Sequence, residues 1–178
     1  MEGRRVLEHL TVEENLAIAG GIRREGVGAL RDELDRVYSF FPRLKRLRNK
    51  TCGYISGGEQ QMVVVGRALI THPYLMLVDE MSMGLAPLIV EEIANILRNI
   101  NEKEHTSILL IEQNATVALG LSEYGYVMES GKIVLDGPSH KLEKNEDIRE
   151  FYLGLSRVGT KKSYKDLKHY SRRKRWLG

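Results

Sequence analysis

The first 71 residues carry apolar side chains at the spacing of amphipathic helices. The clearest case begins at Gly28, where one helix face would hold the apolar residues Leu30, Leu34, Val37, Tyr38 and Phe41. Pro42 is expected to end this helix, because proline lacks the N–H group that a helix interior requires. Together these patterns predict helices over residues 12–19, 28–41 and 57–71, with a strongly basic segment over 43–50 that leads into a loop.

The pattern changes after Pro73. Tyr74 to Val78 is a continuous apolar run, as expected of a strand that is buried on both faces. A second such run follows a helical stretch, and this alternation is typical of an α/β domain with parallel strands. The predicted elements are strands over 74–78 and 107–111, helices over 88–101 and 115–121, a hairpin over 126–128 and 132–135, and a last helix over 146–153.

Length and composition describe one soluble domain with a distinct C-terminal tail. At 178 residues the chain can bury one core. Residues 157–178 hold nine Lys or Arg and one Asp, a net charge of +8, so the rest carries −5 of the total of +3. No run approaches the roughly 20 apolar residues that span a bilayer. Residues 1–10 lack a signal-peptide core, and the single Cys52 fits a reducing cytosol. We therefore expect a cytosolic chain, unless a partner holds it at a membrane.

Two adjacent carboxylates, Asp79 and Glu80, follow the first predicted strand. Phosphoryl transfer needs a cation across the phosphates and an oriented nucleophile. A carboxylate at a strand end can hold Mg²⁺ through water, and its neighbour can polarise an attacking water. The alternative is a strand that ends in two solvated acids.

A Ser-Gly-Gly sequence, Ser56 to Gly58, opens the third predicted helix. Glycines let the backbone approach an anion, and a helix N-terminus offers free N–H groups and a positive dipole end. The alternative is an ordinary capping box made by Ser56 and Glu59. That alternative explains the serine and the glutamate but does not require two glycines, which weaken a helix.

The chain contains no phosphate-binding loop of the form G-x-x-x-x-G-K-[ST]. The one Gly-Lys pair is Gly131-Lys132, but Ile133 stands where Ser or Thr is needed and Tyr126 stands at the first glycine. The loop that cradles the phosphates in many ATPases therefore has no candidate in this sequence.

Several ordered motifs resemble those of ABC transporter ATPases. They are the signature motif (Ile55 to Met62), the Walker B strand (Leu75 to Glu80), the D-loop (Ser82 to Pro87), the switch region (Ile108 to Asn114) and the Q-loop with its following helix (Glu2 to Leu16). The details are similar to the smaller ATP-binding subunit of branched-chain amino-acid transporters, the LivF-like group. The resemblance runs from Glu2 to about Gly154.

The resemblance implies an α/β fold, a partial P-loop NTPase (RecA-like) core with the ABC helical subdomain. In this interpretation residues 1–154 form a truncated ATPase domain that lacks the Walker A region. Its helical subdomain covers about 12–71, its core with Walker B, D-loop and switch region covers 72–154, and a basic tail covers 155–178. The chain is then the C-terminal portion of such a subunit.

The resemblance also implies roles for individual residues. Asp79 would support Mg²⁺, Glu80 would act on water, and Gln113 would stand at the switch position in place of the usual histidine. Gln113 can hydrogen-bond a phosphate but cannot carry a proton. The residues expected at ATP are Ser56, Gly57, Gly58 and Glu59 of the signature motif and Glu2 of the Q-loop.

The implied function is ATP hydrolysis, with ATP and Mg²⁺ as cofactors, to energise import of branched-chain amino acids. The implied partners are a second ABC ATPase subunit and membrane permease subunits, and the implied location is cytoplasmic, peripheral on the inner face of the cell membrane. This chain alone is expected to be inactive, because the Walker A loop is absent.

One alternative is a non-catalytic partner that contributes its signature motif to a complete subunit. Another is a chromosome-maintenance or DNA-repair ATPase, which the absence of long coiled coils disfavours.

The basic tail, residues 156–178, has spaced lysines and arginines with Tyr164, Tyr170 and Trp176. A solvated tail is one interpretation. Nucleic-acid binding has no accompanying motif, and we do not expect it. The preferred interpretation is a tail that lies near the anionic inner leaflet or against partner subunits, since basic residues beside such a surface gain on the order of 1 kcal/mol each.

Overall fold

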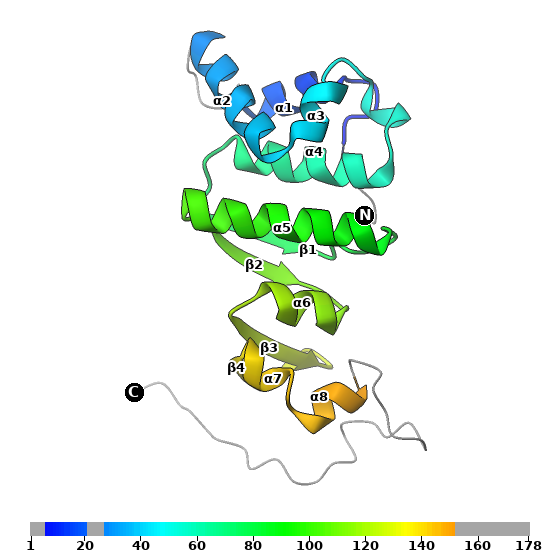
Figure 1. The fold of residues 1–178 in the computed structure, drawn as a ribbon, viewed down its shortest axis with the longest axis vertical. Coiled ribbons are helices and arrows are strands. Elements are labelled where there is room, and N and C mark those ends of the chain that lie inside the picture. Colours follow the sequence, from blue (N-terminus) through cyan, green and yellow to red (C-terminus); the bar gives the residue numbers. More distant parts are fainter. Residues whose placement is uncertain (1–5, 21–26, 152–178) are drawn as a thin grey trace. The chain divides into compact units, whose positions relative to one another are not determined.

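The computed structural model describes residues 6–20 and 27–151 (Figure 1). The chain divides into two units, with the boundary between Gln113 and Asn114. Each unit is described separately. Among the described residues, no helix combines the length and the apolar character that crossing a bilayer requires.

The helices at the start of the first unit pack around a common core. They are α1 (Val12–Gly20), α2 (Val27–Phe40), α3 (Pro42–Leu47), a short 3-10 helix (Cys52–Tyr54) and α4 (Gly57–Leu69). Helix α4 passes close to its neighbours at Gly66, where an added Cβ would lie 3.0 Å from Leu16 Cδ2 and 3.2 Å from Val37 Cγ1. The fully buried side chains of this core include Leu16, Val37, Leu44, Met62 and Leu69.

Helix α3 was not predicted: the sequence showed only a basic segment that leads into a loop, whereas residues 42–47 are helical. Pro42 ends α2 and also begins α3, where its missing N–H group would have no partner in the helix anyway. Leu44 is completely buried. One apolar anchor therefore stabilises a turn of helix whose other side chains are mostly charged.

The amide of Asn15 joins three segments of the first unit. This side chain is completely buried. Its Nδ2 donates to the carbonyl oxygens of Leu7 and Thr11, both at 3.0 Å, and its Oδ1 accepts from the Leu7 N–H at 2.8 Å. Nδ2 also lies 3.2 Å from the sulfur of Cys52. The segment before α1 is thereby fixed against the turn that precedes α4.

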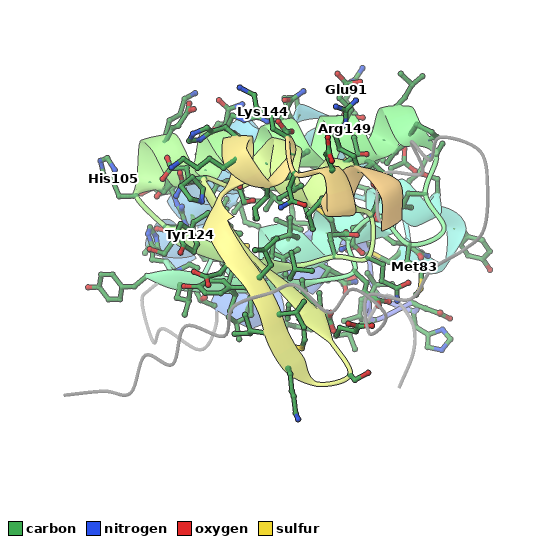
Figure 2. The ribbon with its side chains drawn as sticks, turned by 90° about the horizontal axis from the view of Figure 1, so that it is seen from below. Met83, Glu91, His105, Tyr124, Lys144 and Arg149 are labelled. Atoms are coloured by element: carbon green, nitrogen blue, oxygen red, sulfur yellow. The ribbon has the colours of Figure 1, made fainter. Side chains whose placement is uncertain are left out.

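A two-stranded parallel sheet completes the first unit. Strands β1 (Leu75–Asp79) and β2 (Ser107–Ile111) pair in register from Leu75 opposite Ser107 to Asp79 opposite Ile111. Helix α5 (Pro87–Glu104) connects them, with Glu91 and His105 toward its opposite ends (Figure 2). Met76 and Val78 of β1 are buried, as are Val90, Ile93, Leu97 and Ile100 of α5.

The prediction that β1 is buried on both faces is wrong. Burial alternates along the strand, and Leu75 and Leu77 are 55% and 67% exposed. Leu109 of β2, which pairs with Leu77, is 49% exposed. Successive side chains of a strand point to opposite faces. One face of this sheet is therefore covered, and the other is an open apolar surface in the described part of the first unit.

The second unit is built around an antiparallel hairpin. Its elements are α6 (Ala115–Leu121), β3 (Tyr124–Glu129), β4 (Lys132–Pro138), α7 (Ser139–Leu142) and α8 (Glu146–Phe151). The predicted hairpin is confirmed, and its turn residues Ser130 and Gly131 have φ angles of 50° and 75°, as a type I′ turn requires. The short helix α7 was not predicted. It brings Leu142 against β3, where a Cβ at Gly125 would lie 2.8 Å from Leu142 Cδ1.

Candidate functional site

The start of α4 is a complete capping box. The Ser56 hydroxyl accepts from the Glu59 N–H at 3.4 Å, and Glu59 Oε2 accepts from the Ser56 N–H and hydroxyl, both at 2.8 Å. Within the described residues the N–H groups of Gly57 and Gly58 have no acceptor. The alternative interpretation of Ser56 and Glu59 is thus realised. It fixes the helix start while leaving two N–H groups available to an anion.

Gly58 has a packing role that the sequence did not reveal. Gly58 is buried, and a Cβ added to it would lie 2.4 Å from Cγ2 of Ile89, in the first turn of α5. The second glycine of the motif therefore lets α4 and α5 approach each other. The contact of Gly58 with a phosphate stays a prediction.

Arg43 of α3 supplies positive charge beside the capping glutamate. Its Nε lies 3.8 Å from Glu59 Oε1, and its Nη1 lies 3.3 Å from Glu92 Oε2 on α5. The Arg43 side chain is 40% exposed, so solvent weakens both ion pairs. Arg43 thus links α3, α4 and α5 near the signature motif, a role that the basic segment of the sequence did not indicate.

Glu80 follows the last residue of β1, and the structure brings it to Gln113. The Glu80 N–H donates to the Ile111 carbonyl at 2.9 Å, which extends the ladder between β1 and β2 by one bond. Gln113 Nε2 then donates to Glu80 Oε1 at 2.7 Å. Glu80 has a φ angle of 46°, a left-handed conformation that costs about 1–2 kcal/mol for a residue with a Cβ. Two predicted residues, 33 positions apart, therefore meet at one end of the sheet.

Asp79 ends β1 with an exposed carboxylate. Within the described residues it makes no hydrogen bond or ion pair through its side chain, and no group of three or more His, Cys, Asp or Glu residues could enclose a metal ion. One unpaired carboxylate beside a second, fixed one fits Mg²⁺, which binds few protein oxygens and keeps several waters. The chain has no phosphate loop, so its residues fit the Mg²⁺ and γ-phosphate end of ATP rather than the whole nucleotide.

Sequence reasoning missed the partner of the D-loop. The Ser82 N–H donates to Glu112 Oε1 at 2.8 Å, and the Ser82 hydroxyl donates to Glu112 Oε2 at 2.7 Å. The available signal was the position of Glu112, directly after a strand and directly before Gln113. The predicted Q-loop residue, Glu2, and the basic tail lie outside the described residues.

Comparison with known proteins agrees with these motifs. The pattern of the ABC transporter family matches residues 1–83. BraG, a high-affinity branched-chain amino acid transport ATP-binding protein of Pseudomonas aeruginosa, is 44% identical over 153 residues, which are 86% of this chain and 64% of BraG. The probable branched-chain amino acid transport ATP-binding protein LivF of Archaeoglobus fulgidus is 32% identical over 84% of this chain and 63% of LivF. The chain thus spans less than two thirds of the length of these relatives.

Solved structures show the same architecture. The ADP conformation of MJ1267, an ATP-binding cassette of an ABC transporter, superposes with a TM-score of 0.70 at 26% identity over 83% of this chain and 64% of that protein. The cbiO1 structure from Clostridium perfringens, at 20% identity, gives a TM-score of 0.74 over 85% of this chain and 60% of that protein, which shows the fold alone. The predicted α/β fold class is confirmed. The chain therefore belongs to the family of ABC transporter ATP-binding proteins.

Proposed function

We propose that this chain forms part of an ATP-binding subunit that energises the import of branched-chain amino acids. The similarity to BraG supports the transport class. The observation that carries the chemistry is the 2.7 Å hydrogen bond between Gln113 and Glu80, directly beside the unpaired carboxylate of Asp79. In this proposal the chain works with a second ATPase subunit and with permeases, at the cytoplasmic face of the membrane.

The strand-end residues divide the work. Asp79 would hold Mg²⁺ through water, and the ion would supply neutralising charge at the phosphates. Glu80 accepts a hydrogen bond from the attacking water and orients it. Gln113 donates to one oxygen of Glu80, so the other oxygen is left for water. Because a neutral amide cannot carry a proton, Gln113 orients Glu80 and takes no part in proton transfer.

The signature motif acts on a nucleotide that the second subunit holds. Ser56, Gly57 and Gly58 face the γ-phosphate from the start of α4, while Glu59 keeps that start in place. The phosphate loop supplies most contacts to the β- and γ-phosphates, and this sequence has none. The chain alone is therefore expected to bind ATP weakly and not to hydrolyse it.

A second candidate is a non-catalytic partner that lends only its signature helix. The completed capping box favours this candidate, because Ser56 and Glu59 fix the helix start with residues of this chain alone. In that case Ser56 to Gly58 matter for turnover, and Glu80 of this chain does not.

Complementation of BraG tests both candidates. BraG would carry arginine at the position that aligns with Ser56, so that its own signature motif is disabled. Adding this chain should restore Mg²⁺-dependent phosphate release, and adding its Ser56→Arg variant should not. Loss of the restored turnover with Glu80→Gln supports the catalytic role, whereas full turnover with Glu80→Gln supports the signature-only partner. If the two proteins co-purify without any restored turnover, both candidates are wrong.

A further inference from the structure

We propose that Glu112 is a positioning residue that locks the D-loop, Ser82 to Pro87, to the end of β2 beside Gln113. This inference rests on the proposed function. Both carboxylate oxygens of Glu112 are used by one residue: Oε1 accepts the Ser82 N–H at 2.8 Å and Oε2 accepts the Ser82 hydroxyl at 2.7 Å. A two-point contact fixes orientation as well as distance, and bonds to an ionised acceptor are the stronger kind.

The contact is one of a set that joins two short segments. Residues 80–82 follow β1 and residues 111–113 follow or end β2. The Glu80 N–H bonds to the Ile111 carbonyl at 2.9 Å, and Gln113 bonds to the Glu80 carboxylate at 2.7 Å. The two hydrogen bonds between Ser82 and Glu112 belong to the same set of contacts between these segments. A displacement of Ser82 therefore moves Glu112, and with it the neighbouring Gln113.

Packing of a neighbouring side chain restricts movement of the segment that holds Ser82. Met81, between Glu80 and Ser82, is 1% exposed, so its side chain anchors the middle of the segment in the core. The Met83 N–H donates to the Glu80 carbonyl at 3.2 Å, which closes a turn over the same residues. Within the described residues no Lys or Arg forms an ion pair with Glu112. Ser82 is thus its specific partner rather than one of several.

In this proposal the contact between Glu112 and Ser82 couples the D-loop to Gln113. The D-loop begins at Ser82, and the residue that orients Glu80 is Gln113. With Glu112 between them, the position of the D-loop sets the position of the Gln113 side chain. The structure therefore assigns to Glu112 the coupling of the D-loop to the orientation of Glu80, without direct contact between Glu112 and substrate.

Three variants separate positioning from charge. Glu112→Gln keeps an acceptor for the Ser82 N–H, and its amide can donate to the serine oxygen, because a hydroxyl both donates and accepts. Glu112→Ala removes both bonds, and Ser82→Ala removes one. In the BraG complementation assay we expect Glu112→Ala to lower kcat roughly tenfold with KM for ATP unchanged, since small misplacements near a reacting group are costly. Glu112→Gln should retain most of kcat, and Ser82→Ala should fall between them.

A measurement on the chain alone keeps this test independent of the proposed function. In nuclear magnetic resonance spectra, Glu112→Ala should speed exchange of the Ser82 backbone amide roughly tenfold or more. It should also move the Gln113 side-chain amide signals toward those of a free glutamine, and Glu112→Gln should change neither. If Glu112→Ala leaves the Gln113 signals or kcat as in the unaltered chain, or if Gln and Ala variants lose kcat equally, the positioning role is wrong. If the unaltered chain restores no turnover, the proposed function fails and the Gln113 signals alone decide.

Discussion

His72 and Glu33 form a close contact between the turn after α4 and helix α2, with 2.7 Å between Nε2 of His72 and Oε2 of Glu33. Arg36 extends this contact. Its Nε donates to the same glutamate oxygen at 2.9 Å, and its Nη1 lies 3.1 Å from Glu104 at the end of α5. The group therefore joins α2 to residues that follow α4 and to α5.

The Glu33 contact should make stability depend on pH. Burial alone would raise the pKa of this carboxyl, but the hydrogen bonds and charges of His72 and Arg36 outweigh burial and lower the pKa below its usual 4.5. A lowered folded-state pKa stabilises the fold above the unfolded value, and this stabilisation is lost as pH falls through the folded value. Glu33→Gln should therefore lower the free energy of unfolding by about 1 kcal/mol at pH 7, and the difference should shrink as pH falls below 4.5 and through the lowered pKa. Urea unfolding at several pH values measures this, with Glu102→Gln on the exposed face of α5 as control. A deficit that stays the same from pH 7 down to the acid limit of the folded state would contradict the assignment.

Gly58→Ala should destabilise the first unit. The new Cβ would meet Ile89 Cγ2 at 2.4 Å, and overpacking of this kind typically costs about 1–3 kcal/mol. Thermal or urea unfolding measures the effect. Gly120→Ala in α6 is the matched control, because nothing lies within 4 Å of an added Cβ there. The double variant Gly58→Ala with Ile89→Ala should lose less stability than the sum of the two single variants. Strict additivity would show that the two residues do not meet.

The two faces of β1 should respond differently to truncation. Met76 is 4% exposed and Leu77 is 67% exposed. Met76→Ala should lower the free energy of unfolding by about 2–5 kcal/mol, whereas Leu77→Ala should change it by about 0.5 kcal/mol or less. Equilibrium unfolding of the two variants compares them directly. An equal loss from both would mean that the Leu77 face is covered in solution.

The thiol of Cys52 should be unreactive in the folded chain. Burial raises its pKa, and the nearby charge of Arg67 offsets this only in part. Because the thiolate is the reactive form, labelling at pH 8 should be much slower than for a free cysteine and should accelerate only as urea unfolds α1 to α4. Rapid stoichiometric labelling in native buffer would be the opposite result.

Elements with a strong local pattern were predictable from the sequence. The helix over 57–71 corresponds to α4, and both parallel strands lie where their apolar runs stand. The places of Glu80 and Gln113 just after the two strands were also predictable, but the hydrogen bond between them was not predicted and comes from the structure. These features depend on residues that are neighbours along the chain or that end adjacent strands.

Features that depend on tertiary packing were not predictable. No helix was predicted for the basic residues of α3, and the burial of Leu44 in the core explains why they form one. The apolar run of β1 suggested that both faces of the strand are covered. An apolar sequence shows that a strand can be buried, but it does not show which other elements cover each face. The contact between Ser82 and Glu112 joins residues 30 positions apart through the two carboxylate oxygens of Glu112. Neither a serine nor a glutamate at these positions predicts such a contact.

The segment before α1 and the turn before α4 share more than the Asn15 amide. The Cys52 N–H donates to the Leu10 carbonyl at 2.8 Å, and the Gly53 N–H donates to the Glu8 carbonyl at 3.0 Å. Backbone and side-chain hydrogen bonds together hold residues 8–11 directly against residues 52–53. A displacement of residues 8–11 would therefore act directly on residues 52–53 of the short 3-10 helix, three to four positions before Ser56 of the signature motif.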